Sequence, residues 1–184
     1  MLIDSHAHLG MPHFDRDRSE VIHRAAEEGV QFIFTLGTNV DSSEEAVHLA
    51  HENPALFAIV GIHPHEAKTL NENCLRRMRE VAKDTKVKAY GEIGLDFFRN
   101  LSPPDIQITA FRRQIRLAGE LDLPVVIHDR EAHDETLQIL QAEGGKGLSV
   151  LFHCFSGDLR MAEKVIDMGF YLSIPGTVTF PKAH

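Results

Sequence analysis

His6 and His8 stand two residues apart, next to the first apolar run of the chain. In an extended segment, side chains two residues apart point the same way, so this pair can bind one cation. A His-x-His pair alone also fits ordinary surface or core histidines. Its position after the first strand of a repeating strand and helix pattern favours the metal-binding interpretation.

Three more candidate ligands follow later apolar runs. Glu92 lies in Tyr90-Gly-Glu-Ile-Gly-Leu-Asp96, where two glycines allow backbone or ligand to approach its carboxylate. His128 follows Val-Val-Ile, and His153 follows Val-Leu-Phe. A carboxylate can bridge two cations, so we expect Glu92 to be a ligand and the catalytic group. The alternatives are a surface ion pair for Glu92 and buried, hydrogen-bonded histidines.

A second set of residues is predicted to contact substrate. His63 and His65, in Gly-Ile-His-Pro-His, are better placed to touch substrate or a metal ligand than to bind a cation. Arg99 and Arg130 can hold an anionic group, because guanidinium forks suit phosphate, although surface ion pairs explain them equally well. Asp96 either orients its neighbours or caps a turn. Histidines in predicted helices or loops, including His133, are expected to be solvated.

Seven short apolar runs supply the elements that would position these residues. They read as strands near residues 2–4, 31–36, 56–60, 88–91, 124–127, 148–152 and 170–174. Several are apolar on both faces, which is typical of parallel strands covered by helices.

Helical patterns lie between these runs. Capping boxes are predicted at Asp17 with Glu20, at Asp41 with Glu44 and at Thr69 with Glu72. The later helices are predicted to start near Pro103 and Ser156, and the fifth to end at residues 144–145.

Five of the predicted strands end beside a candidate ligand, and this placement predicts the fold. In parallel (β/α) barrels, loops at the carboxyl ends of the strands form the active site. Strands one and six would lie roughly 20 Å apart or more in a flat sheet, so a shared cation requires the sheet to curl. We therefore predict an α/β fold of the TIM-barrel type. Because complete barrels take about 250 residues, we expect one domain over residues 1–184, truncated after about seven strands, with its C-terminal part missing.

Composition narrows the function classes. With a formal charge of −8, the protein has no overall positive potential to attract a polyanion. Local groups or bound cations would have to attract phosphates. The sequence shows no apolar run long enough for a membrane span and no secretory signal, and two distant cysteines do not suggest a disulfide scaffold. These features predict a cytoplasmic protein without a membrane partner.

Five ordered motifs resemble those of the TatD family of metal-dependent deoxyribonucleases, within the amidohydrolase-like barrels. They are Asp-Ser-His-Ala-His at 4–8, Gly-Ile-His-Pro-His at 61–65, Gly-Glu-Ile-Gly-Leu-Asp at 91–96, Ile-His-Asp-Arg at 127–130 and Phe-His-Cys-Phe-Ser-Gly at 152–157. The resemblance implies divalent cations, here taken as two of Mg²⁺, Mn²⁺ or Zn²⁺. It implies hydrolysis of DNA phosphodiesters, commonly from strand ends. It also implies that His6, His8, Glu92, His128 and His153 are the metal ligands.

One departure from the family leaves other functions open. Similar proteins carry a further aspartate in a Glu-Thr-Asp-like motif after the last strand, and this sequence has no such motif. One alternative is a metal-dependent hydrolase of carbon–nitrogen or ester bonds, including aminoacyl esters, because the same chemistry serves carbonyl substrates. The other is an inactive fragment or interaction module.

Overall fold

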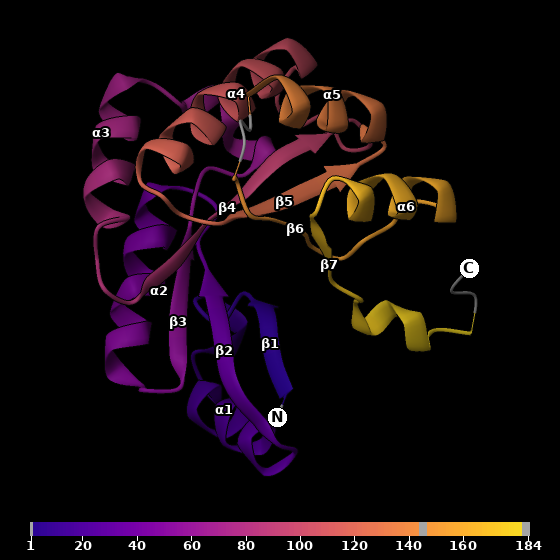
Figure 1. Ribbon diagram of the computed structural model, residues 1–184. Helices are drawn as coiled ribbons and strands as arrows, with labels where there is room; N and C mark the ends of the chain where they lie inside the picture. Colours follow the sequence, from indigo (N-terminus) through magenta and orange to yellow (C-terminus); the bar gives the residue numbers. More distant parts are fainter. Residues whose placement is uncertain (1, 144–146, 182–184) are drawn as a thin grey trace.

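The computed structural model describes residues 2–143 and 147–181, which form one seven-stranded parallel sheet with helices outside it (Figure 1). The strands are β1 Leu2–Ala7, β2 Val30–Leu36, β3 Leu56–Val60, β4 Val87–Asp96, β5 Val125–Arg130, β6 Val150–Phe152 and β7 Tyr171–Leu172. The helices are α1 Arg18–Glu27, α2 Val40–Glu52, α3 Glu72–Val81, α4 Pro104–Glu120, α5 His133–Glu143 and α6 Leu159–Asp167. Short 3₁₀ helices are η1 Pro12–Phe14, η2 Pro64–Thr69 and η3 Gly176–Thr179.

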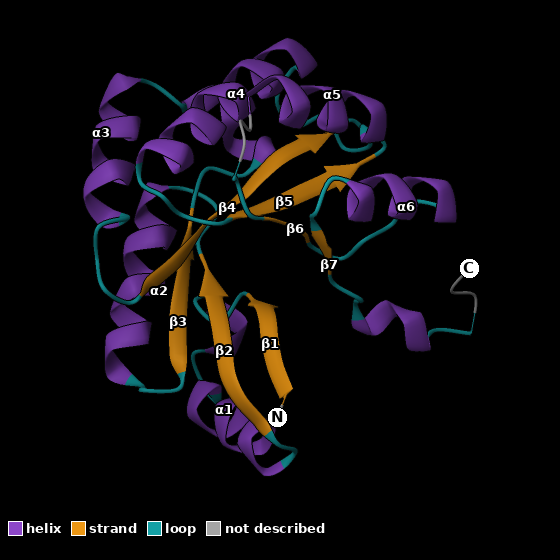
Figure 2. Cartoon of the chain, viewed as in Figure 1, coloured by secondary structure: helices purple, strands orange, loops and turns teal. Residues whose placement is uncertain are grey.

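Strands and helices alternate along the chain, as the hydrophobic pattern predicts (Figure 2). The strands pair in chain order, from β1 to β7, and every pair is parallel. The carboxyl ends of all seven therefore meet at the same edge of the sheet. The α/β fold of the TIM-barrel type is confirmed.

Three strands extend further than predicted, and one of them, β5, continues past Ile127 to Arg130. β4 continues past Gly91 to Asp96, because Ile93 to Asp96 pair with the end of β5. β1 likewise continues through His6 to Ala7. Glu92 and His6 thus lie within the carboxyl-terminal halves of their strands rather than in the loops that follow.

The predicted capping boxes are wrong. Asp17 precedes α1 but makes no side-chain cap. Asn39 caps α2 in a box with Ser42, and Asn71 caps α3. Asparagine is as good an acceptor for the helix amides as aspartate or threonine. Asn39 stands two residues before the predicted cap Asp41, and Asn71 stands two residues after the predicted cap Thr69. α6 begins after Asp158, whereas the predicted end of the fifth helix lies outside the described residues.

Most of the core lies between the sheet's outer face and the helices. Outward side chains such as Ile33, Val60 and Ile127 pack in one cluster with helix residues such as Leu49 and Ile115. A smaller apolar cluster, made by Leu36, Ile59, Ala89 and Val126, lies apart from it. This packing fixes the strands and thereby the side chains at their carboxyl ends.

The sheet curls but does not close within the described residues. β1 and β7 are the two end strands of the hydrogen-bonded order, and Figure 1 shows the sheet bending round between them. No helix in this part of the chain is long and apolar enough to cross a membrane.

Candidate metal centre

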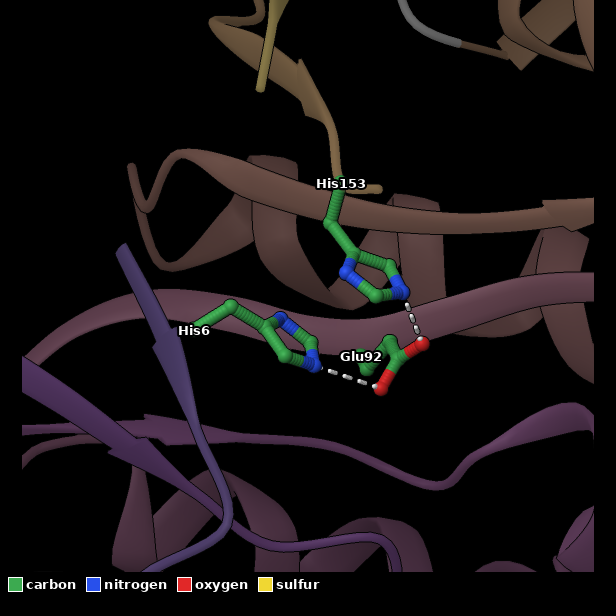
Figure 3. Close-up of side chains that lie close together, drawn as sticks. All are labelled: His6, Glu92 and His153. Atoms are coloured by element: carbon green, nitrogen blue, oxygen red, sulfur yellow. Dashed lines mark ion pairs between the residues drawn. The ribbon is translucent and has the colours of Figure 1, made fainter. Parts of the chain in front are cut away.

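Glu92 lies at the centre of a ring of histidines. Its Oε1 is 2.6 Å from His128 Nδ1 and 2.7 Å from His153 Nε2, and its Oε2 is 3.2 Å from His6 Nε2. His63 Nε2 lies 3.7 Å from Oε1, and His8 Nε2 lies 3.9 Å from Oε2. Figure 3 shows His6, from β1, and His153, from the turn after β6, approaching the two carboxylate oxygens. All five predicted ligands therefore meet at one point.

Two groups in this ring have their ligand atoms close enough to hold a cation. One consists of His6, Glu92 and His153, and the other of His63, Glu92 and His128, with the atoms of each group within 4.8 Å of one another. Glu92 belongs to both, which suits a carboxylate that bridges two cations. His63, predicted to contact substrate, lies inside the second group.

The charge state of Glu92 is set by its neighbours. Burial opposes ionisation of this carboxyl, which is 2% exposed, but hydrogen bonds from His128 and His153 hold its pKa well below the usual range. Glu92 is therefore an anion at neutral pH, as a metal ligand must be.

Most of the surrounding imidazoles are neutral. Burial lowers the pKa of His63 to about 3 and also lowers the pKa values of His8 and His153. For His128, burial likewise opposes protonation, but hydrogen bonds to Glu92 and Asp96 raise its pKa overall. Neutral imidazole is the form that binds metal, so burial prepares His8, His63 and His153 for that role.

The two imidazole nitrogens of His6 are available to bind a ligand. Both Nδ1 and Nε2 of His6 are buried and lack a well-aligned hydrogen-bond partner among the described residues, although Nε2 lies near Glu92. A buried polar atom without a partner costs free energy, which a cation bound at Nε2 would offset. Nitrogen and carboxylate ligands together suit Zn²⁺, Mn²⁺ and similar divalent ions. The residues present therefore fit a divalent metal.

Asp96 links His128, which contacts Glu92, to His65, which is predicted to contact substrate. Its Oδ2 lies 2.7 Å from His65 Nε2 and 3.1 Å from His128 Nε2, while Oδ1 accepts from the amide of Arg99. Of the two predicted roles for Asp96, the structure shows both: it orients histidines and it holds the turn after β4.

Glycines allow β4 to approach its neighbours around Glu92, as predicted. A Cβ at Gly91 would lie 2.5 Å from the carbonyl oxygen of Val126. At Gly94, where φ is +143°, a Cβ would lie 2.0 Å from the carbonyl oxygen of His128. Only glycine tolerates this conformation and this contact, and the contact draws β4 against the strand that carries His128.

The ring opens into a cavity of about 450 Å³. Its lining includes His8, His63, His65, Glu92, His128, His153, Arg130 and Ser156. Of the predicted substrate contacts, His63, His65 and Arg130 thus face the cavity, whereas Arg99 is exposed on the turn after β4 and is absent from the lining.

Asp129 was not among the residues singled out in the sequence. It lines the cavity, and its Oδ2 lies 2.8 Å from Nδ1 of His133. His133, predicted to be solvated, is partly exposed and is also paired with this carboxylate. Burial raises the pKa of Asp129. The spacing of four residues between the two was the available signal, because it joins the end of β5 to the first turn of α5.

Comparison with known proteins identifies relatives along the whole chain. A family model described as TatD related DNase matches residues 3–184. A metal-dependent hydrolase of Bacillus subtilis is 40% identical over 183 residues, covering 100% of this chain and 72% of the relative. A protein of Cronobacter sakazakii named 3′-5′ ssDNA/RNA exonuclease TatD is 41% identical over 165 residues, covering 90% of this chain and 63% of the relative.

A solved structure gives the same result. The crystal structure of a TatD homologue from Escherichia coli matches with a TM-score of 0.91 and 32% identity, over 99% of this chain and 71% of the homologue. The chain thus spans between 63% and 72% of the length of these three proteins.

Proposed function

The chain belongs to the TatD related DNase family of metal-dependent hydrolases, and on this premise we propose that it hydrolyses phosphodiester bonds of single-stranded nucleic acid. The observation that carries the proposal is the contact of one buried anion, Glu92, with five histidines at the carboxyl edge of the sheet. The Cronobacter relative's name supports a single-stranded substrate.

Six side chains would hold two divalent cations. His6, His8 and His153 lie on one side of Glu92, and His128 lies with His63 on another. When bound, such cations lower the pKa of a water molecule and polarise a phosphoryl oxygen. Glu92 keeps its negative charge between the two groups, and the buried imidazoles keep their lone pairs available.

The cavity supplies the remaining contacts. Arg130 places a guanidinium at the cavity wall, where it can pair with a phosphate of the strand. Arg99, on the neighbouring turn, is proposed to contact the strand outside the cavity. His65, whose Nε2 pairs with Asp96, is proposed to contact the same strand. The guanidinium groups matter because the chain as a whole is acidic, with a net charge of −8.

Cleavage of a labelled single strand tests the proposal. The chain loaded with Mg²⁺, Mn²⁺ or Zn²⁺ should shorten the strand, and chelator-treated chain should not. Glu92→Gln should abolish cleavage, because it removes the charge that both ligand groups share. Glu120→Gln, which changes an exposed carboxylate paired with Arg79, is the matched control and should cleave normally.

Two results would contradict the proposal. Turnover of amides or carboxylic esters without cleavage of nucleic acid would assign the site to carbonyl substrates. Absence of any turnover by metal-loaded chain would favour an interaction module. A cytoplasmic location, where reduced thiols and nucleic acid are both present, is part of this proposal and stays a prediction.

A further inference from the structure

Phe98 is an exposed aromatic residue beside the candidate metal centre. It lies two residues after Asp96, the last residue of β4, and it is 58% exposed. The guanidinium carbon of Arg130, which lines the cavity, lies 5.2 Å from the centre of the Phe98 ring. The ring is thus held at the rim of the cavity, on the side where Arg130 stands.

The backbone that carries Phe98 is fixed by hydrogen bonds. The amide of Phe97 donates to the carbonyl oxygen of Arg130 over 2.9 Å, which joins the turn to the end of β5. The amide of Arg99 donates to Asp96 Oδ1 over 2.7 Å, and the side chain of Asn100 donates to the carbonyl oxygen of Phe97 over 2.8 Å. The carboxylate of Asp96 that orients His128 therefore also positions this turn.

Exposure alone would not distinguish Phe98, because single apolar side chains on protein surfaces are common. Many other exposed apolar side chains lie on the end strands of the open sheet or in the segment after β7, namely Leu2, Ile3, Tyr171, Ile174, Val178 and Phe180. Phe98 differs because it is in a fixed turn, contacts a cation and borders the cavity.

Arg130 is available for a ligand while it lies over this ring. Within residues 2–143 and 147–181 it forms no ion pair, whereas Arg112 and Arg116 are both paired with Glu143. An aromatic ring next to an unpaired guanidinium provides a stacking surface and a positive charge together. Proteins that bind single-stranded nucleic acid combine these two features, since every base has a π-face and every nucleotide has a phosphate.

We infer that Phe98 is a stacking platform for one base of a single-stranded nucleic acid, next to the phosphate held by Arg130. The inference rests on the proposed function and adds to it a base-binding subsite outside the metal centre. The base stacks on the exposed ring of Phe98, and Arg130 pairs with the adjoining phosphate. The strand end is thereby directed towards Glu92.

Phe98→Leu and Phe98→Trp separate stacking from simple apolar contact. Base–aromatic stacking contributes about 1–3 kcal/mol per base, so Phe98→Leu should raise KM for a short DNA strand by about 5-fold to 150-fold with little change in kcat. Phe98→Trp should keep KM near that of the unmodified chain. Phe32→Leu, at the amino-terminal half of β2, makes the same substitution away from the site and should change neither constant.

Strands that lack one base at a time identify the partner of Phe98. At one position, removing the base should lower the affinity of the unmodified chain for the strand. For the strand without that base, Phe98→Leu should bind as tightly as the unmodified chain. In a second experiment, the strand carries the fluorescent base 2-aminopurine at that position, and chelator prevents cleavage. The unmodified chain should quench the 2-aminopurine fluorescence, and Phe98→Leu should quench it less. This second readout does not depend on cleavage.

The outcomes are distinct. Equal KM for Phe98→Leu and the unmodified chain, or an equal loss on every strand whichever base is missing, would overturn the stacking inference while cleavage still supports the proposed function. Absence of cleavage by the metal-loaded, unmodified chain would overturn the proposed function. Quenching that depends on Phe98 would, in that event, still show a base-binding subsite.

Discussion

The imidazole rings of His6 and His153 stack face to face, with centroids 3.7 Å apart and an angle of 11° between their planes. His6 belongs to β1 and His153 follows β6, so five strand spacings separate them in the hydrogen-bonded order. In a flat sheet those spacings amount to roughly 24 Å. The stack therefore shows how far the sheet curls, and the curl brings both histidines to Glu92.

Asp96→Asn tests whether this carboxylate positions His128 for metal binding. The negative Asp96 lies 3.1 Å from His128 Nε2, and such a partner fixes the ring and increases its basicity. We expect metal affinity, measured by calorimetric titration, to fall about 10-fold to 100-fold. Asp167→Asn, at the exposed end of α6, should leave affinity unchanged. Unchanged affinity in Asp96→Asn would show that His128 is held by packing alone.

Gly94→Ala tests the close approach of β4 to β5. The new Cβ would meet the carbonyl oxygen of His128 at 2.0 Å, in a conformation that alanine rarely adopts. The free energy of unfolding in urea should fall by at least about 1–3 kcal/mol. Gly119→Ala, in α4 with open space around it, should be neutral or stabilising by about 0.5–1 kcal/mol. Equal stability of the two variants would mean that the strands separate at little cost.

The sequence predicted the strands, their order and four of the five histidines that surround Glu92, because apolar runs and ligand positions repeat at regular intervals. Cap positions were missed, since the capping-box spacing to a glutamate is satisfied by Asp41 and Thr69 and not by Asn39 and Asn71, which form the caps. The place of His63 within the second ligand group could not be predicted. It depends on the distance across β3, β4 and β5, which arises from the curl of the whole sheet rather than from any local pattern.

Tyr90→Phe tests a buried hydroxyl in the core. Tyr90 has no exposed surface, and its hydroxyl lacks a hydrogen-bond partner among the described residues. An unpaired buried hydroxyl costs about 1–3 kcal/mol, so its removal should leave stability unchanged or raise it by about 1 kcal/mol. Thermal and urea unfolding measure the change, and Tyr171→Phe on an exposed hydroxyl should have no effect. A clear loss of stability in Tyr90→Phe would reveal a bound water or another partner.

Stability of the metal-free chain should fall as the pH drops from 7.5 to 5.5. Burial lowers the pKa of His63 from its ordinary value of 6.5 to about 3, so the unfolded chain takes up a proton in this range that the folded chain does not. Burial acts in the same direction on His8 and His153. The raised pKa of His128 has the opposite effect on stability, but it is one group against three whose pKa values are lowered.

Urea unfolding in chelator at each pH measures this dependence. Each proton taken up only by the unfolded chain removes about 1.4 kcal/mol per pH unit below its pKa of 6.5. His63→Gln should flatten the slope, because glutamine does not titrate, whereas His48→Gln on the exposed face of α2 should leave it unchanged. A slope that is the same in His63→Gln and in the unmodified chain would mean that His63 is protonated in the folded state, and therefore that burial does not keep this imidazole ready to bind a cation.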